Sequence, residues 1–347
     1  MNVNPFNITF GKEPLNPINR TYEINKIVET FSNENPFSEI YVLTGPRGCG
    51  KTVALNILIK HYRNEKDWMT VDLNPESDLL EQLAGKICDQ VKSNKMFLKT
   101  EFSFSFHGIS FSMKGERPVT NISTLLNSML KVLQKKNIKL LITIDEVNNN
   151  SNMRVFVHEY QSFLREGFSC FLVMTGLYEN ISALENEKSL TFLYRAPKIN
   201  LEALSIRSIT YKYKELFSIN EEKAIELAKI TKGYAYAYQL LGYILYENNT
   251  TKVNDNILDQ FDSYLETRVY FKIWQSLSEN EKDILKLVAR GKTSNTDIMS
   301  SLDMASNALA VYKKRLANRG IVDTNTRATL SFKLPRFSEF IKFNYFD

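Results

Sequence analysis

The chain has 347 residues, of which 43% are hydrophobic and 24% are charged, so it can bury a substantial core and is not a disordered protein. This length exceeds that of one compact domain, and we expect two or three. Three cysteines without a C-x-x-C spacing exclude a disulfide scaffold and a cysteine-ligated zinc site. The lack of a long apolar run and of a signal-peptide pattern predicts a cytoplasmic protein that does not contact membranes.

The net charge of +5 is concentrated near the C-terminus. Residues 276–347 contain twelve Lys and Arg against eight Asp and Glu, whereas the rest of the chain contains 32 against 31. A local basic excess is what a phosphate-binding surface requires, although a solvated face has the same composition. The charge alone leaves both interpretations open.

The first predicted elements surround a glycine-rich segment. Apolar residues at helical spacing predict a helix over 22–31, and a short apolar run predicts a strand over 40–43. Residues 45–52 then read GPRGCGKT and are followed by an apolar helical pattern over 54–58. A strand, a glycine loop and a helix are the context in which G-x-x-x-x-G-K-[ST] binds phosphate.

The residue types of this loop explain its predicted chemistry. Glycines let successive backbone N–H groups curl around an anion, and the following helix directs its partially positive N-terminus at the same anion. Lys51 can bridge the β- and γ-phosphates, which also makes it a predicted catalytic residue, and the Thr52 hydroxyl can bind Mg²⁺. The predicted nucleotide-binding residues of the loop are Gly45, Pro46, Arg47, Gly48, Cys49, Gly50, Lys51 and Thr52.

A phosphate loop requires an acidic partner at the end of a buried strand. Strands are predicted over 68–72, 139–144 and 170–174, and the second is apolar enough for the centre of a parallel sheet. Asp145 follows that strand and is the predicted Mg²⁺ ligand. Glu146 is the predicted general base, which would orient and deprotonate the attacking water.

Thr175 follows the strand over 170–174, and two roles are open for its hydroxyl. It could contact the γ-phosphate or the attacking water, because the carboxyl ends of parallel strands lie at one edge of the sheet. It could instead cap the loop that follows. Thr175 is included among the predicted catalytic residues on the first of these grounds.

A β-hairpin insertion is predicted near 101–114. Apolar and polar residues alternate strictly on both sides of His107 and Gly108, which is typical of two strands joined by a short turn, with one apolar face. This face could pack on its own domain or contact a partner or DNA, because a surface this apolar must be covered.

The C-terminal part of the chain predicts mostly helices. Helical spacing over 201–275 indicates a small helical lid. A capping box that begins at Ser278 opens a set of three helices, of which the third spans 305–318. Two short strands are predicted over 321–322 and 329–334. Three helices and a two-stranded wing resemble a winged helix-turn-helix domain.

Basic residues cluster on and after the third helix of this domain. A winged helix would present them to a DNA groove and its phosphates. The predicted DNA-contacting residues are Lys313, Lys314, Arg315, Arg319 and Arg327. Winged helices also serve as protein-interaction modules, so the sequence leaves that alternative open.

Three segments in this order, TGPRGCGKT, LLITIDEV and FLVMTG, resemble those of AAA+ and related STAND-type ATPases. They look closest to the archaeal and bacterial Walker-type ATPases that are allied to the origin-recognition proteins of replication. The stretches NRTYE at 19–23, LTFLYRAPKINL at 190–201 and TKGYAYAYQLLG at 231–242 are similar to further motifs of these proteins. The resemblance covers residues 14–250.

The resemblance implies roles for two arginines. Arg20 would flank the adenine pocket, and Arg195 would either act as a finger or sensor for transition-state charge or form a structural salt bridge. A finger that acts on a neighbouring chain would require a homo-oligomer. The sequence departs from the family at Tyr236, where AAA+ lids carry a sensor arginine, and at Ala235, where STAND-type lids carry a proline.

Together these features predict an α/β protein with a P-loop NTPase parallel sheet flanked by helices over 1–200, a helical lid over 201–275 and a winged helix-turn-helix domain over 276–347. The predicted function is a Mg²⁺-dependent ATPase that converts ATP to ADP and phosphate and binds double-stranded DNA through the winged helix. The alternative is a STAND-like nucleotide-driven signalling switch whose winged helix binds protein. A chain that only binds nucleotide is disfavoured because the loop and both acidic residues are present.

Overall fold

The structure of the protein is a computed structural model that describes residues 3–9, 14–18, 20–93, 105–106, 109–110, 121–324 and 328–346. The chain divides into two compact units. The sheet unit comprises residues 20–44 and 54–200, and the helical unit comprises residues 1–19, 45–53 and 201–347. The glycine loop belongs to the helical unit, whereas the strand before it belongs to the sheet unit.

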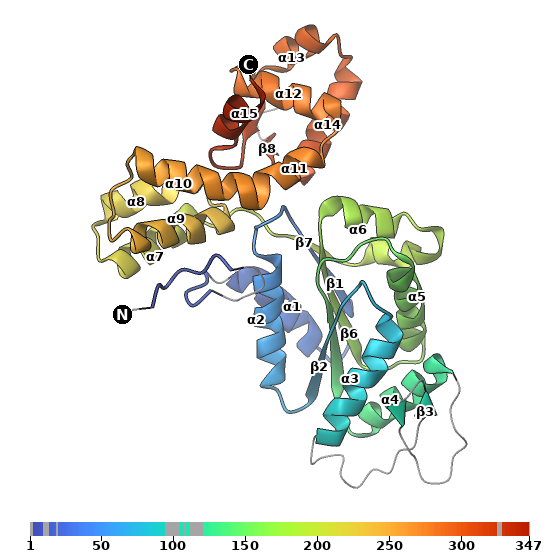
Figure 1. Ribbon diagram of the computed structural model, residues 1–347. Coiled ribbons are helices and arrows are strands. Elements are labelled where there is room, and N and C mark those ends of the chain that lie inside the picture. Colours follow the sequence, from blue (N-terminus) through green and yellow to red (C-terminus); the bar gives the residue numbers. More distant parts are fainter. Residues whose placement is uncertain are drawn as a thin grey trace. The chain divides into compact units, whose positions relative to one another are not determined.

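A five-stranded parallel sheet forms the centre of the sheet unit (Figure 1). Neighbouring strands all pair in parallel, in the order β2 (Trp68–Leu73), β5 (Lys139–Ile144), β6 (Cys170–Gly176), β1 (Ile40–Thr44) and β7 (Lys198–Asn200). The four strands predicted from apolar runs are confirmed, and so is the predicted fold class of a parallel sheet flanked by helices.

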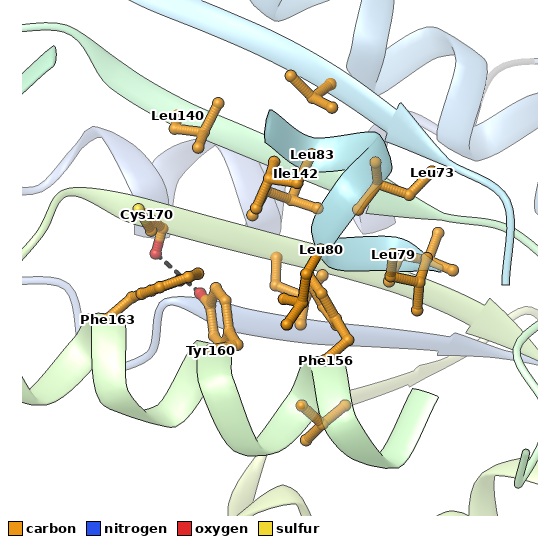
Figure 2. Packing of buried hydrophobic residues seen from close by; sticks show 14 of the residues in the cluster. Leu73, Leu79, Leu80, Leu83, Leu140, Ile142, Phe156, Tyr160, Phe163 and Cys170 are labelled. Carbon is orange, nitrogen blue, oxygen red and sulfur yellow. Dashed lines mark hydrogen bonds between the residues drawn. The ribbon is translucent and has the colours of Figure 1, made fainter. Parts of the chain in front are cut away.

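One face of the sheet packs against two helices, α3 (Leu79–Ser93) and α5 (Ser151–Arg165). Alternate strand residues such as Ile142 and Cys170 point to this face, because successive side chains of a strand point in opposite directions (Figure 2). The Tyr160 hydroxyl of α5 donates a hydrogen bond of 2.8 Å to the carbonyl oxygen of Cys170. Helix and strand are thus joined by both packing and hydrogen bonding.

Aromatic rings fill the opposite face of the sheet. Phe31 of α1 (Thr21–Ser32) contacts Tyr41 and Phe171, with ring centroids 5.7 Å and 4.7 Å away. Trp68 lies on the other side of Phe171, at 4.9 Å. Because both faces are covered, the central strands are buried almost throughout, which is why they read as continuous apolar runs.

The sheet unit contains further helices and a small hairpin. The helices are α2 (Lys51–Arg63), whose first turn lies in the helical unit, α4 (Ile122–Lys135), α6 (Tyr178–Glu185) and a 3₁₀ helix (Lys188–Arg195). Two short strands, β3 (Ser105–Phe106) and β4 (Ile109–Ser110), pair antiparallel where the alternating pattern predicts a hairpin. His107 and Gly108, the predicted turn, lie outside the described residues.

The region predicted as a lid is helical. It contains α7 (Ile206–Phe217), α8 (Glu221–Ile230), α9 (Ala235–Glu247) and α10 (Asp255–Leu265), followed by a π-helical turn (Glu266–Tyr270) and α11 (Phe271–Gln275). The N-terminal segment packs onto α9, because the Phe6 ring lies directly over Gly242. A Cβ atom at Gly242 would be 2.3 Å from that ring, so this helix needs a glycine there.

The C-terminal region shows the predicted order of elements. Three helices, α12 (Glu279–Ala289), α13 (Asn295–Leu302) and α14 (Ser306–Asn318), precede the antiparallel strands β8 (Val322–Asp323) and β9 (Ser331–Phe332). The capping box between Ser278 and Glu281 is present, β8 is as long as predicted but begins one residue later, and β9 is shorter than predicted. A further helix, α15 (Phe337–Tyr345), follows. The assignment of this region as a winged helix, and the domain boundaries, stay predictions.

Candidate nucleotide-binding site

The glycine loop leaves β1 after Thr44 and enters α2 at Lys51. Gly45, Gly48 and Gly50 have φ angles of +151°, +71° and +95°. The angle at Gly48 lies in the left-handed region, which residues with a Cβ atom rarely adopt. The glycine at this position is therefore required by the backbone conformation of the loop.

Lys51 folds back onto the loop that precedes it. Its side chain is buried, with 9% of its surface exposed. The ammonium group donates hydrogen bonds of 2.9 Å to the carbonyl oxygens of Gly45 and Pro46. These bonds hold a full positive charge at the loop, where it attracts any anion that the loop binds. Thr52, the next residue, is half-buried in the first turn of α2.

Three of the predicted catalytic and metal-binding residues lie together at the carboxyl ends of β5 and β6. The buried Thr175 hydroxyl donates a hydrogen bond to Oδ1 of Asp145. The backbone N–H of Glu146 donates to the same Asp145 oxygen at 3.0 Å and to the Thr175 hydroxyl at 3.3 Å. The Thr175 hydroxyl thus contacts the Asp145 carboxylate, and its predicted contact with the γ-phosphate or the attacking water stays a prediction.

Glu146 occupies an uncommon backbone conformation, with a φ angle of +54°, and its side chain is exposed. A residue with a side chain pays a small energetic cost for this conformation, and such positions cluster at functional sites. The segment after it is anchored to the segment after β2. Asn148 donates to the Glu76 carboxylate at 2.7 Å, and Asn150 donates to the carbonyl oxygen of Pro75 at 2.8 Å.

The donor chemistry of these residues fits Mg²⁺. Asp145 provides a carboxylate and Thr52 a hydroxyl, and this cation prefers oxygen ligands. Within the described ranges, no group of three or more His, Cys, Asp or Glu side chains is arranged to hold a metal ion. Magnesium is usually held by one or two carboxylates together with water and substrate phosphates.

The two predicted arginines have different environments. Arg20 is buried, directly precedes α1 and forms an ion pair of 3.4 Å with Glu23. Arg195 is exposed at the end of the 3₁₀ helix. An exposed guanidinium is available to bind a second molecule, whereas a buried one mainly orders its own surroundings.

The predicted DNA-contacting residues are not equivalent. Lys314 and Arg315 are exposed on α14. Lys313 is buried, and its ammonium donates a hydrogen bond of 2.8 Å to Asn295, so the prediction that it faces DNA requires correction. Burial also lowers the pKa of Lys313. Arg319 is partly exposed and donates to the carbonyl oxygen of Ser276 at 3.1 Å. Arg327 lies outside the described residues.

Sequence reasoning missed one residue beside the loop. Tyr234 precedes α9, and its hydroxyl donates a hydrogen bond of 2.6 Å to the carbonyl oxygen of Arg47. The tyrosine lies 187 positions away in the chain, and no pattern in the sequence indicates the contact. The segment was singled out only by resemblance to other lids, and that resemblance assigns no role to this tyrosine.

Family models match two parts of the chain. One, described as an ATPase domain predominantly from Archaea, matches residues 18–193. The other, described as a domain of unknown function, matches residues 267–341. A comparison of the sequence with curated proteins finds no match.

Solved structures of similar fold include the Walker-type ATPase PABY2304 of Pyrococcus abyssi and the ORC2 protein of Aeropyrum pernix in its ADPNP–ADP complexes. The first is 15% identical, with a TM-score of 0.61 over 93% of this chain and 95% of that chain. The second is 14% identical, with a TM-score of 0.61 over 96% of each chain. These likenesses establish the P-loop NTPase fold. No helix in the described part of the chain is long and apolar enough to cross a membrane.

Proposed function

The chain belongs to the family of ATPase domains found predominantly in Archaea, and we propose that it is a Mg²⁺-dependent ATPase that binds ATP at the loop of residues 45–52. The observation that carries the proposal is the combination of a positive φ at Gly48, a buried Lys51 ammonium held at the loop, and a helix that begins at Lys51. Backbone amides, an ammonium and a helix N-terminus are the groups that bind phosphate.

The remaining roles follow from the residues at the strand ends. We assign Mg²⁺ to Thr52 and Asp145, and the ion would neutralise charge on the phosphates. Thr175 orients Asp145 through its hydrogen bond, and Glu146 is the general base for the attacking water. The exposed Arg195 suits a guanidinium supplied to a second copy of the chain, which would make the active form a homo-oligomer.

The choice of adenine nucleotide has separate support. The similarly folded ORC2 protein of Aeropyrum pernix was solved in ADPNP–ADP complexes. That observation concerns a protein of 14% identity, so it supports the ligand class without assigning any residue of this chain. We extend it to ATP and ADP as ligands of the 45–52 loop.

We further propose that α14 binds duplex DNA. Positions 306, 307, 310, 311, 314 and 315 are exposed and recur at a spacing of three to four residues, so they share one face of the helix. This face carries the cations Lys314 and Arg315, and α14 contains no acidic residue. A basic, uncovered helix face is suited to phosphate and base contacts in a groove.

A nucleotide-driven switch is the second candidate function, because the C-terminal region contacts the glycine loop within the helical unit. A Cβ atom at Gly320, just after α14, would lie 2.6 Å from the Pro46 ring. A change of loop conformation on nucleotide binding would therefore be felt directly at the end of α14. The two candidates differ in what α14 binds, and duplex affinity separates them.

Turnover of ATP tests the proposed activity. Glu146→Gln keeps the shape of the side chain but removes the base, so we expect kcat to fall by about 100-fold or more while ATP affinity stays within about twofold. The matched control is Glu166→Gln, an exposed glutamate of the same unit, which should keep wild-type turnover. Absence of Mg²⁺-dependent phosphate release from the wild-type chain would contradict the proposed ATPase activity. Wild-type turnover in Glu146→Gln would contradict only the assignment of Glu146 as the general base.

A further inference from the structure

The glycine loop is held by the segment that precedes α9. Tyr234 is buried, with 5% of its surface exposed, and its hydroxyl donates a hydrogen bond of 2.6 Å to the carbonyl oxygen of Arg47. Two residues later, the backbone N–H of Tyr236 donates to the carbonyl oxygen of Gly48 at 3.1 Å. Two consecutive carbonyl groups of the loop are therefore bound from one side.

The phenol ring also sets the space available to the loop. A Cβ atom at Gly48 would lie 2.3 Å from the Tyr234 hydroxyl oxygen and 3.1 Å from Cβ of Tyr236. Real Cβ atoms essentially never come as close as 2.3 Å to another atom. Gly48 is thus needed for this contact as well as for its positive φ angle.

The position of Tyr234 is itself fixed by a tight turn. Lys232 and Gly233 both have positive φ angles, of +47° and +76°. The N–H of Tyr234 donates to the carbonyl oxygen of Thr231 at 2.8 Å, and the N–H of Leu204 donates to that of Gly233 at 2.7 Å. The hydroxyl therefore reaches the loop from a turn with little freedom to move.

Binding these carbonyl oxygens determines where the loop amides point. A trans peptide is planar, with its C=O and N–H groups on opposite sides. Since the oxygens of Arg47 and Gly48 point to the Tyr234 side, the N–H groups of Gly48 and Cys49 point away from it. The Cys49 N–H is directed back into the loop, where it donates to the Pro46 oxygen at 3.4 Å.

These contacts do not compete with an anion. Tyr234 and Tyr236 bind carbonyl oxygens, which would repel a phosphate, and leave the amide hydrogens turned the other way. A hydrogen bond to a carbonyl also polarises its peptide and makes the N–H on the other side a better donor. The arrangement therefore favours phosphate binding.

We propose that Tyr234 is a positioning residue of the nucleotide site, which holds the Arg47–Gly48 peptide so that the loop amides face the phosphates of a nucleoside di- or triphosphate. This inference rests on the proposed function, because it assumes that the 45–52 loop binds nucleotide. It adds that this affinity depends on a hydroxyl contributed from 187 residues further along the chain.

Calorimetric titration of Tyr234→Phe with ADP and with ATP tests the proposal. The variant keeps the ring and removes only the hydroxyl, so we expect the Kd for both nucleotides to rise about threefold to tenfold, the range of one hydrogen bond. Nucleotide analogues with the same phosphates should lose the same factor, while kcat at saturating ATP should change less than KM.

Tyr213→Phe is the matched control. The Tyr213 hydroxyl is buried in the same unit and donates a hydrogen bond of 2.7 Å to the carbonyl oxygen of Tyr238, away from the loop. Both variants should lower the melting temperature in the absence of nucleotide, because each loses the hydrogen bond that its hydroxyl donates to a backbone carbonyl. Only Tyr234→Phe should lose nucleotide affinity.

The possible results distinguish a failure of the proposed function from a failure of the role proposed for Tyr234. If the wild-type chain binds neither ADP nor ATP, the proposed function and this inference both fail. If it binds them and Tyr234→Phe has the affinity of Tyr213→Phe, the inference alone is overturned. Tighter binding by Tyr234→Phe would also overturn it, because the hydroxyl would then oppose nucleotide.

Discussion

Two lysines show how differently the glycine loop and α14 are built. Lys51 and Lys313 are buried to the same degree, with 9% and 8% of their surfaces exposed, and both donate to oxygen atoms. Lys51 bonds to the backbone of the loop that it follows, so its position comes from local sequence. Lys313 bonds to Asn295 of another helix, so its position comes from packing.

The sequence predicts the location of a lysine side chain well where local backbone conformation fixes it, and poorly where helix packing fixes it. In the loop, glycine spacing dictates the backbone, and the backbone dictates where the lysine lies. On α14, the three consecutive basic residues do not all share one face, because each residue of a helix is rotated by 100° from the last. Only Lys314 and Arg315 of this run reach solvent, while Lys313 lies inside the domain.

The largest loss of ATP affinity from a change in the loop backbone is expected at Gly48. Gly48→Ala introduces a Cβ atom at a φ angle of +71° and 2.3 Å from the Tyr234 hydroxyl, so the loop must change shape. We expect ATP affinity to fall by about 10- to 100-fold, from the combined cost of left-handed backbone and overpacking. Calorimetry with ATP measures this loss.

Gly167→Ala is the control for Gly48→Ala. Gly167 has nearly the same φ angle, +74°, but among the described residues, apart from Gly167 and its two chain neighbours, no atom lies within 4 Å of an added Cβ. The substitution should cost only backbone strain, about 1 kcal/mol in the free energy of unfolding, and should leave ATP affinity unchanged. Equal nucleotide affinity in the two variants would show that the loop does not depend on its glycine backbone.

A smaller effect is expected on α14. Lys314→Ala and Arg315→Ala should each weaken binding of duplex DNA about threefold to tenfold. Each should also reduce the slope of log K against the logarithm of the salt concentration by about one. Lys313→Ala should leave duplex affinity unchanged and lower the free energy of unfolding by about 1–3 kcal/mol, because Asn295 loses its buried partner. Fluorescence anisotropy at several salt concentrations measures the affinities.

The outcome on α14 also separates the two candidate functions. Failure of the wild-type chain to bind duplex DNA at low salt would contradict the proposal that α14 binds DNA and would favour the nucleotide-driven switch. Loss of duplex affinity in Lys313→Ala, with the other two variants unaffected, would contradict the assignment of buried and exposed cations.

Much of the fold could be predicted because its signals are local. Continuous apolar runs identify β5 and β6, since a parallel sheet buries both faces, and the glycine loop identifies the end of β1. The grouping of Asp145, Glu146 and Thr175 could be predicted from the rule that parallel strands end at one edge. Helix α15 was missed, although Phe337, Phe340 and Ile341 recur at helical spacing and are buried.

The rest depends on contacts between residues far apart in the chain. The bond between Thr175 and Asp145 joins two strand ends that are 30 residues apart in the chain. The contact of Tyr234 with Arg47, and that of Lys313 with Asn295, arise only when separate helices and loops pack together. No periodicity or motif encodes such contacts, because they depend on the arrangement of whole elements.

The central claim is that residues 45–52 bind the phosphates of ATP, and calorimetric titration of Lys51→Ala with Mg²⁺ and ATP tests it most directly. We expect affinity to fall by about 100-fold or more, because the substitution removes the charge held at the loop. Lys60→Ala, the same change at an exposed position of α2, should bind ATP like the wild-type chain. Wild-type affinity in Lys51→Ala would contradict the account.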